Sequence, residues 1–266
     1  MIADKKRQTL LPLNGSLSSK AHFLITHLWL PLLFFLAALW WIESRELDFQ
    51  LEDYLYRLNH RNWDNGITDF LALYFHDAPK IFLKRMVMFL WAFALLAVLL
   101  HENMPVRYTG IIKLRRWFSH YRSGLFFLSI FLPLGPFLTN VFKHTTHIDC
   151  PWHLVRYGGE HAFQSIFSLP TRGDGHCFPS SHASTGFGLL AAYFFAREYF
   201  YRYRFHVLSV AVSAGSVFGL TQMYRGAHFL SHVIGSMALC WFVALAGYCV
   251  WVHLRSDEER QGVKEQ

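Results

Sequence analysis

Three short polar clusters in an otherwise apolar chain contain residue types suited to phosphate chemistry. They are Lys143, the run Pro179–His182 and the run Arg225–His228. Lysine and arginine can neutralise the equatorial oxygens of a phosphoryl group, where charge sits in the transition state. Two histidines can supply a nucleophile, His228, and a general acid for the leaving alkoxide, His182. The clusters therefore indicate phosphoryl transfer through a phosphohistidine.

The serines of the second cluster could bind phosphate at a helix N-terminus or could only cap the helix. Pro179 ends the preceding loop and lets Ser180 and Ser181 enter a predicted helix, whose first N–H groups and dipole favour an anion. Ser180 could instead be a simple N-cap, and Lys143 alone could be a membrane-surface anchor. Three clusters on one predicted face favour a shared site. Because no Asp/Glu cluster suited to a divalent metal accompanies them, we predict a metal-independent reaction without a cofactor.

The elements that must position these clusters are membrane-spanning helices. Of 266 residues, 53% are hydrophobic and 16% charged, and a spanning helix needs about 20 mostly apolar residues. Soluble folds rarely bury so many helices on every face. We therefore predict an all-α, polytopic membrane protein with about six transmembrane helices. The predicted spans are Leu24–Ile42, Met86–Leu100, Leu125–Phe142, Ala183–Phe200, Val207–Gln222 and Leu230–Val252.

The placement of charge predicts the orientation of these spans. The net charge of +7 could suggest nucleic acid, but the lysines and arginines gather before the first span and in alternate connections. The positive-inside rule puts these segments and both termini in the cytoplasm. The three clusters then face the outer, periplasmic side of the cytoplasmic membrane, and no nucleic-acid partner is predicted. The segment Glu43–Arg85 could be an interfacial amphipathic helix or a cap over the site.

One membrane-embedded domain, residues 23–255, is expected between a cytoplasmic leader (1–22) and a charged cytoplasmic tail (256–266). The first apolar run follows a long polar leader, which fits a retained helix better than a cleaved signal peptide. The oligomeric state stays open.

Cysteines and further histidines cluster in the predicted outer connection. Cys150 and Cys177 could form a disulfide if that side is an oxidising compartment, and the sequence leaves their pairing open. His144 and His147 lie near Lys143, but they have no third ligand at a recognisable spacing. The sequence therefore predicts no metal site there.

In order and spacing, the clusters resemble the motifs of the type 2 phosphatidic acid phosphatase superfamily. Those motifs are Lys-x6-Arg-Pro, Pro-Ser-Gly-His and Ser-Arg-x5-His-x3-Asp. The resemblance covers the third to the sixth predicted span and implies a six-helix membrane fold with its site on the outer face. It implies that Lys143 and Ser180 contact phosphate, that His182 protonates the leaving group and that His228 is the nucleophile. The run Asp149–Trp152 is similar to a bacterial branch with Cys-Pro-Trp in its first motif.

Several positions depart from these motifs. Cys150 stands in place of the first-motif arginine, and Ser181 replaces a glycine. Gln222 stands in place of the third-motif arginine. His232 occupies the position of the aspartate that orients the nucleophile, and a neutral imidazole gives less electrostatic help than a carboxylate.

Nearby residues could replace what is missing. Arg225 lies three residues after Gln222, and residues so spaced share a helix face. His232 could accept a hydrogen bond from His228. Other candidates for support in the same outer connection are the acids Asp149 and Asp174 and the arginines Arg156 and Arg172.

The resemblance and the clusters together predict an integral membrane phosphatase that hydrolyses a phosphomonoester or pyrophosphate of a lipid. Implied substrates include isoprenyl pyrophosphate, phosphatidylglycerophosphate, phosphatidic acid and the phosphates of lipid A, and the sequence does not select among them. Two alternatives stay open. A phosphotransferase would pass the phosphoryl group to a second lipid, and a transporter or accessory protein would keep the helices without the chemistry.

Overall fold

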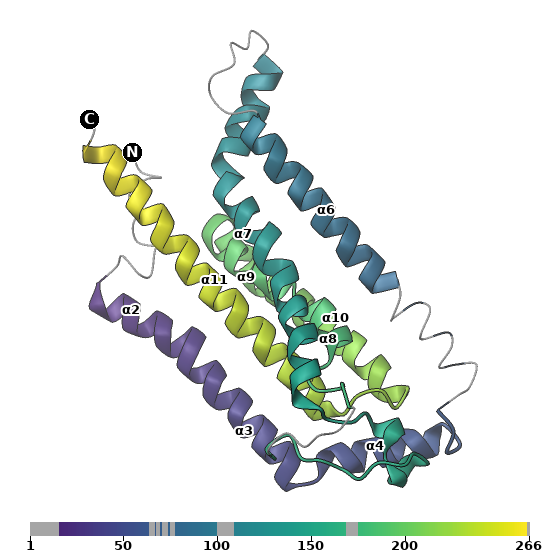
Figure 1. Ribbon diagram of the computed structural model, residues 1–266. Helices are drawn as coiled ribbons and strands as arrows, with labels where there is room; N and C mark the ends of the chain where they lie inside the picture. Colours follow the sequence, from purple (N-terminus) through teal and green to yellow (C-terminus); the bar gives the residue numbers. More distant parts are fainter. Residues whose placement is uncertain are drawn as a thin grey trace.

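In the computed structural model, residues 16–63, 67, 70, 74, 78–99, 109–168 and 175–264 are described, and they form a bundle of helices (Figure 1). Within this part of the chain the one β-type pairing is an isolated bridge between Leu154 and His161. The predicted all-α class is confirmed. The helices are α2 (Leu17–Leu24), η1 (Ile25–Trp29), α3 (Leu30–Ser44), α4 (Leu47–Leu58), α6 (Ala78–Leu99), α7 (Thr109–Thr146), η3 (Pro151–His153), η4 (Val155–Tyr157), α8 (Ser181–Phe187), α9 (Leu190–Tyr199), η5 (Tyr201–Tyr203), α10 (Arg204–Tyr224) and α11 (Leu230–Lys264).

Membrane-spanning character is confirmed by the length and composition of these helices. Within the described residues, 4 segments are long and apolar enough to cross a bilayer. Helix α6 and the pair α8–α9 correspond to the other two predicted spans and run along the same bundle (Figure 1). Helix α2 begins and α11 ends at the same end of the bundle, opposite α4. The 4 segments are Leu17–Ser44, Arg116–His153, Tyr201–Tyr224 and Leu230–Ser256.

The flanks predicted as leader and tail are partly helical. Residues 1–15 lie outside the described part of the chain. Helix α2 begins at Leu17 because Ser16 caps it, its side chain accepting from the amide of Ser19. At the other end, α11 continues to Lys264. Helical structure therefore extends beyond both ends of the apolar domain expected at 23–255.

One predicted span, Ala183–Phe200, is two helices in the structure. The break falls at Gly188, where an added Cβ would lie 2.6 Å from the carbonyl oxygen of Leu132 in α7. In α8, a Cβ on Gly186 would lie 2.4 Å from the backbone nitrogen of Gly215 in α10. The short helix α8 is thus packed backbone to backbone between its neighbours, which fixes its N-terminus at the end of the bundle that carries the polar clusters.

Helix α4 lies across that same end of the bundle (Figure 1). The Asp48 carboxylate accepts a 2.9 Å hydrogen bond from the amide of Ser231, in the first turn of α11. The Asn59 side chain donates a 2.8 Å hydrogen bond to the carbonyl of Tyr224, the last residue of α10. Helix α4 therefore closes the end of α10 and the start of α11. Several residues of that segment between 64 and 77 lie outside the described part.

Folding shifts the pKa values of two carboxyl groups in α4 in opposite directions. Burial raises the pKa of Asp48 from 3.8 to about 6, so the folded protein binds its proton more tightly than the unfolded chain. The stability that this proton contributes is fully present at pH values below 3.8, the pKa of Asp48 in the unfolded chain, and is lost as pH rises through about 6. Hydrogen bonding from Arg156 lowers the pKa of Asp53. The stability that ionised Asp53 contributes is therefore present at pH values above 3.8, its pKa in the unfolded chain, and is lost as pH falls through the lower pKa of the folded protein.

We expect Asp48→Asn, which keeps an oxygen acceptor for the Ser231 amide, to gain stability relative to the wild type as pH rises from about 4 to about 7. The gain should be on the order of 2–3 kcal/mol, the free energy of a pKa shift of this size. Thermal unfolding of the purified protein in detergent measures it. The matched variant Asp53→Asn should lose stability relative to the wild type as pH rises to about 4, below this range, and should differ from it by a nearly constant amount between about 4 and 7. A constant difference between wild type and Asp48→Asn at every pH would contradict the assignment.

Candidate active site

A cavity of about 290 Å³ opens where the ends of α7, α8, α10 and α11 meet. All three polar clusters contribute to its walls, and so do both half-cystines of a disulfide. The lining residues are Lys143, Cys150, Trp152, His153, His176, Cys177, Ser181, His182, Gln222, Arg225, Ala227 and His228.

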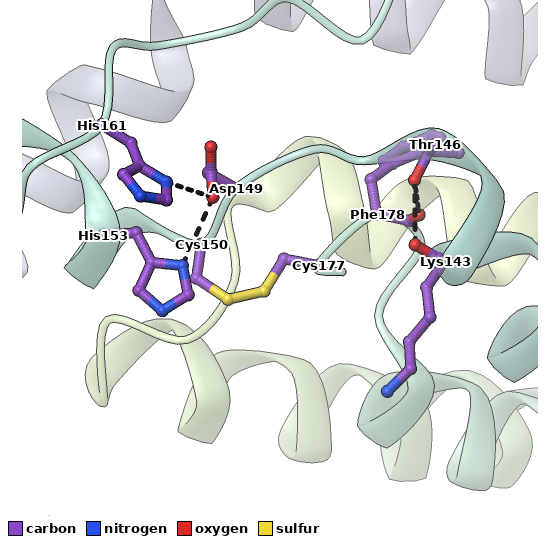
Figure 2. Close-up of a disulfide and its surroundings, with 8 residues drawn as sticks. All are labelled: Lys143, Thr146, Asp149, Cys150, His153, His161, Cys177 and Phe178. Carbon is purple, nitrogen blue, oxygen red and sulfur yellow. Dashed lines mark hydrogen bonds and ion pairs between the residues drawn. A yellow bond between two sulfur atoms is a disulfide. The ribbon is translucent and has the colours of Figure 1, made fainter. Parts of the chain in front are cut away.

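The first wall is the end of α7 and the loop that follows it (Figure 2). Thr146 donates hydrogen bonds from its hydroxyl to the carbonyls of Phe178, at 2.6 Å, and Lys143, at 3.3 Å. A disulfide joins Cys150 to Cys177 with a Cα–Cα distance of 5.2 Å, within the usual range for such bonds. These links hold the half-buried Lys143 and the segment that leads into α8 against each other.

The second wall is the N-terminus of α8. Ser180 is fully buried and caps the helix, its hydroxyl accepting a 3.3 Å hydrogen bond from the amide of Ala183. The Ser180 amide donates to the carbonyl of His232, and Ser236 donates from its hydroxyl to the carbonyls of Ser180 and His232. Ser181, and not Ser180, is the serine that lines the cavity. Of the two interpretations of Ser180, the structure therefore contains the hydrogen bond of the helix cap.

The third wall is the corner between α10 and α11. Gly226 has a φ of 69°, and an added Cβ would lie 2.5 Å from the Trp63 ring, so this position requires glycine. Just before it, the Arg225 guanidinium donates a 3.0 Å hydrogen bond to the side-chain oxygen of Gln222. Gln222 is fully buried. The residue in the third-motif arginine position thus holds the arginine that follows it, and both line the cavity.

The rings of three histidines lie in sequence in this region. The ring centroids of His182 and His228 are 5.9 Å apart across the cavity, and those of His228 and His232 are 5.8 Å apart in an edge-to-face contact. His228 is 5% exposed and His232 is 1% exposed. His232 also packs against the rings of Phe178 and Phe229. His232 therefore packs against the His228 ring but does not itself line the cavity.

Two donors in the cavity wall have unmet hydrogen-bonding capacity. Among the described residues, the Ser181 hydroxyl and the side-chain nitrogen of Gln222 are buried without a hydrogen-bond partner. Buried polar groups are normally paired, and two such donors beside the cations Lys143 and Arg225 suit an anionic ligand. The arrangement can thus hold a phosphate between two positive charges and two imidazoles.

Other residues singled out from the sequence lie elsewhere. The Asp149 carboxylate accepts from the ring of His161. Arg156 pairs with Asp53 of α4 through two hydrogen bonds, and its guanidinium lies over the ring of Phe49. Neither Asp149 nor Arg156 is among the residues that line the cavity. Arg172 and Asp174 lie outside the described residues.

Three lining residues were not predicted to be part of the site. They are Trp152, His153 and His176. Their proximity depends on the disulfide and on the hydrogen bond from the Trp152 amide to the carbonyl of Gly226, at 3.0 Å. In the sequence, the only indication that His176 lies at the site is its position next to Cys177.

Comparison with known proteins identifies the surrounding fold. Residues 124–256, which contain every motif position from Lys143 to His232, match the PAP2 superfamily. The chain belongs to the PAP2 superfamily. A lipid A 4'-phosphatase from Francisella tularensis subsp. novicida (strain U112) is 27% identical over 203 residues, covering 75% of this chain and 84% of that protein. No solved structure matches the chain.

Membership of the PAP2 superfamily confirms the resemblance inferred from the motifs. The family is a phosphatase superfamily, and the relative is a phosphatase that acts on a lipid. Together with the apolar helices, this supports a membrane-embedded lipid phosphatase.

The disulfide provides a test of how the PAP2 cavity is held together. We expect the double variant Cys150→Ala/Cys177→Ala to be destabilised by about 3–4 kcal/mol, because a bond between residues 27 positions apart removes loop entropy from the unfolded chain. Thermal unfolding with and without reductant measures this. Reductant should lower the melting temperature of the wild type and of Cys249→Ala, a control at a free cysteine, but not that of the double variant. A wild type insensitive to reductant would contradict the prediction.

Proposed function

We propose that this PAP2 protein is a lipid phosphate phosphatase that works through a phosphohistidine on His228. One observation carries the proposal: a single cavity gathers Lys143, Arg225, His182 and His228. Cations bind the phosphoryl oxygens, and the two imidazoles flank the position where the phosphorus would lie. A nucleophile, a general acid and two cations can together support phosphoryl transfer.

In the first half-reaction, a ring nitrogen of neutral His228 attacks the phosphorus, and the bond between phosphorus and the lipid oxygen breaks. Protonated His182 gives its proton to the departing oxygen, so the lipid leaves as an alcohol. Lys143 and Arg225 neutralise the charge on the equatorial oxygens, assisted by the hydroxyl of Ser181 and the amide of Gln222. Ser180 contributes by capping α8, whose N-terminal dipole favours the anion.

In the second half-reaction, neutral His182 takes a proton from water, and the resulting hydroxide oxygen attacks the phosphohistidine. Inorganic phosphate leaves, and His228 regains its lone pair while His182 holds the proton needed for the next cycle. His232 lies where the family motif has aspartate, so we infer that it acts mainly by fixing the orientation of the His228 ring. Its burial among aromatic rings supports this positioning role.

We infer that the cavity opens on the outer face of the cytoplasmic membrane, with both termini in the cytoplasm. The disulfide at the cavity supports this, since such bonds persist in oxidising compartments. So does the charge pattern: the N-terminal part of α7 carries Lys113 and Arg116, and η5 and the start of α10 carry Arg202 and Arg204. These helix ends lie away from the end of the bundle with the cavity (Figure 1), as the positive-inside rule expects for cytoplasmic connections.

For the substrate, we propose a phosphomonoester of lipid A or of a similar phosphorylated lipid. The support is the relative, a lipid A 4'-phosphatase, which aligns over most of both chains. A panel of lipid A phosphates, phosphatidic acid, phosphatidylglycerophosphate and isoprenyl pyrophosphate tests this choice. Phosphate released fastest from lipid A supports it, whereas equal or faster release from another lipid would replace it.

Alanine variants test the roles of the two cavity histidines. His228→Ala should reduce phosphate release to background, because the covalent intermediate cannot form. His182→Ala should lose about 10²- to 10⁴-fold, the usual contribution of a general acid. His206→Ala, at an exposed histidine in the first turn of α10, is the matched control and should be unaffected. The assay measures inorganic phosphate released from a lipid phosphate in detergent.

Unchanged release by His228→Ala would overturn the mechanism. Label that passes from the lipid to a second lipid and not to water would make the protein a phosphotransferase using the same histidine. Absence of turnover on every lipid phosphate, with a folded protein, would favour a transporter or accessory role.

A further inference from the structure

Three side chains of metal-ligating type converge in the loop after α7 without serving the phosphoryl transfer proposed above. They are Asp149, His153 and His161, and one ligand atom from each lies within 4.8 Å of the others. The same oxygen of Asp149 is 2.9 Å from Nδ1 of His161 and 3.4 Å from Nδ1 of His153. Figure 2 shows both rings directed at this carboxylate, next to the disulfide.

The backbone fixes these three side chains relative to one another. Asp149 directly precedes Cys150 of the disulfide, and His153 ends the short helix η3. The amide of His161 donates to the carbonyl of His153 at 2.8 Å, and the amide of Val155 donates to the carbonyl of His161 at 2.9 Å. The two histidines are thus on paired segments and cannot separate without breaking this short ladder.

Close packing in the turn between the two histidines adds to the constraint. An added Cβ on Gly159 would lie 2.2 Å from the carbonyl of His153, so the turn needs glycine to bring the segments this near. Preorganised ligands favour metal binding, because little conformational freedom is then lost when the ion binds.

Stability alone does not account for the arrangement. The side chains of His153 and His161 are each 45% exposed, and ion pairs at exposed positions contribute little to folding. Two imidazole nitrogens and one carboxylate oxygen are, however, the ligand set of many Zn²⁺ sites that keep a fourth position open. The exposure of both rings would give an ion access from solvent.

We propose that Asp149, His153 and His161 bind a divalent transition-metal ion of the zinc type at the rim of the phosphate cavity. His153 belongs both to this group and to the cavity lining. The bound ion fastens the loop that carries Cys150 and places positive charge beside the entrance used by an anionic lipid. The chemistry at His228 does not pass through the ion, so this site goes beyond the proposed function and can be tested apart from it.

Metal binding is tested directly on the full-length protein, purified in detergent without a polyhistidine tag and stripped with chelator. Titration with ZnCl₂ should raise the melting temperature by several degrees, since a ligand of the folded state stabilises it. Titration with CoCl₂ should give the visible absorption of a four- or five-coordinate Co²⁺ ion. Saturation at one ion per chain is expected.

Matched variants separate this site from general binding by surface histidines. His161→Ala should weaken Zn²⁺ affinity about 100-fold or more through loss of a ligand, a change at least as large as that seen when supporting groups of metal ligands are removed. Asp149→Asn keeps an oxygen acceptor for both rings but lowers the ligand charge, so it should fold normally and bind Zn²⁺ at least about 10-fold more weakly. His206→Ala should bind as the wild type does. Equal Zn²⁺ affinity in wild type and Asp149→Asn, or no Co²⁺ spectrum in the wild type, would overturn the proposal.

Discussion

Polar groups at the ends of membrane helices can form a phosphate site only if something other than the lipid holds those ends together. In this protein the links are hydrogen bonds between helix termini and one disulfide. Ser236 and the Ser180 amide join α8 to α11, Thr146 joins α7 to the segment before α8, and Asp48 closes the start of α11. Because each link fixes a backbone end, the side chains of Lys143, Ser181 and His228 need few further contacts to face one cavity.

The same constraint bears on the departures from the PAP2 motifs. A side chain can be replaced when its neighbour reaches the same space from an adjoining turn. Gln222 accepts a hydrogen bond from Arg225, and we propose that Arg225 supplies the cation from three residues further along the chain. For His232, whose ring is buried against His228 and two phenylalanines, we propose that packing takes the place of the aspartate's charge in orienting the nucleophile.

The sequence predicted the helices and the motif residues well, because both depend on local patterns. Apolar length indicated the spans, and motif spacing indicated the residues that line the cavity, including Lys143, His182 and His228. What it did not predict depends on contacts between distant segments. The break at Gly188 arises from the approach of Leu132, the cap at Ser231 comes from Asp48 on α4, and the metal-type cluster needs the pairing of His153 with His161. Asp149 was a candidate partner for the nucleophile, and its bond to His161 places it in that cluster instead.

The central claim is that His228 carries the phosphoryl group during turnover, and trapping that intermediate tests it most directly. His182→Ala retains the nucleophile but lacks the base for hydrolysis, so a phosphate ester with a good leaving group should leave it phosphorylated. Rapid quenching in alkali, where a phosphohistidine survives, followed by peptide mass spectrometry should find one phosphoryl group on His228, and acid should remove it. Phosphate on another residue, or an unmodified His228 during steady turnover by the same variant, would contradict the account.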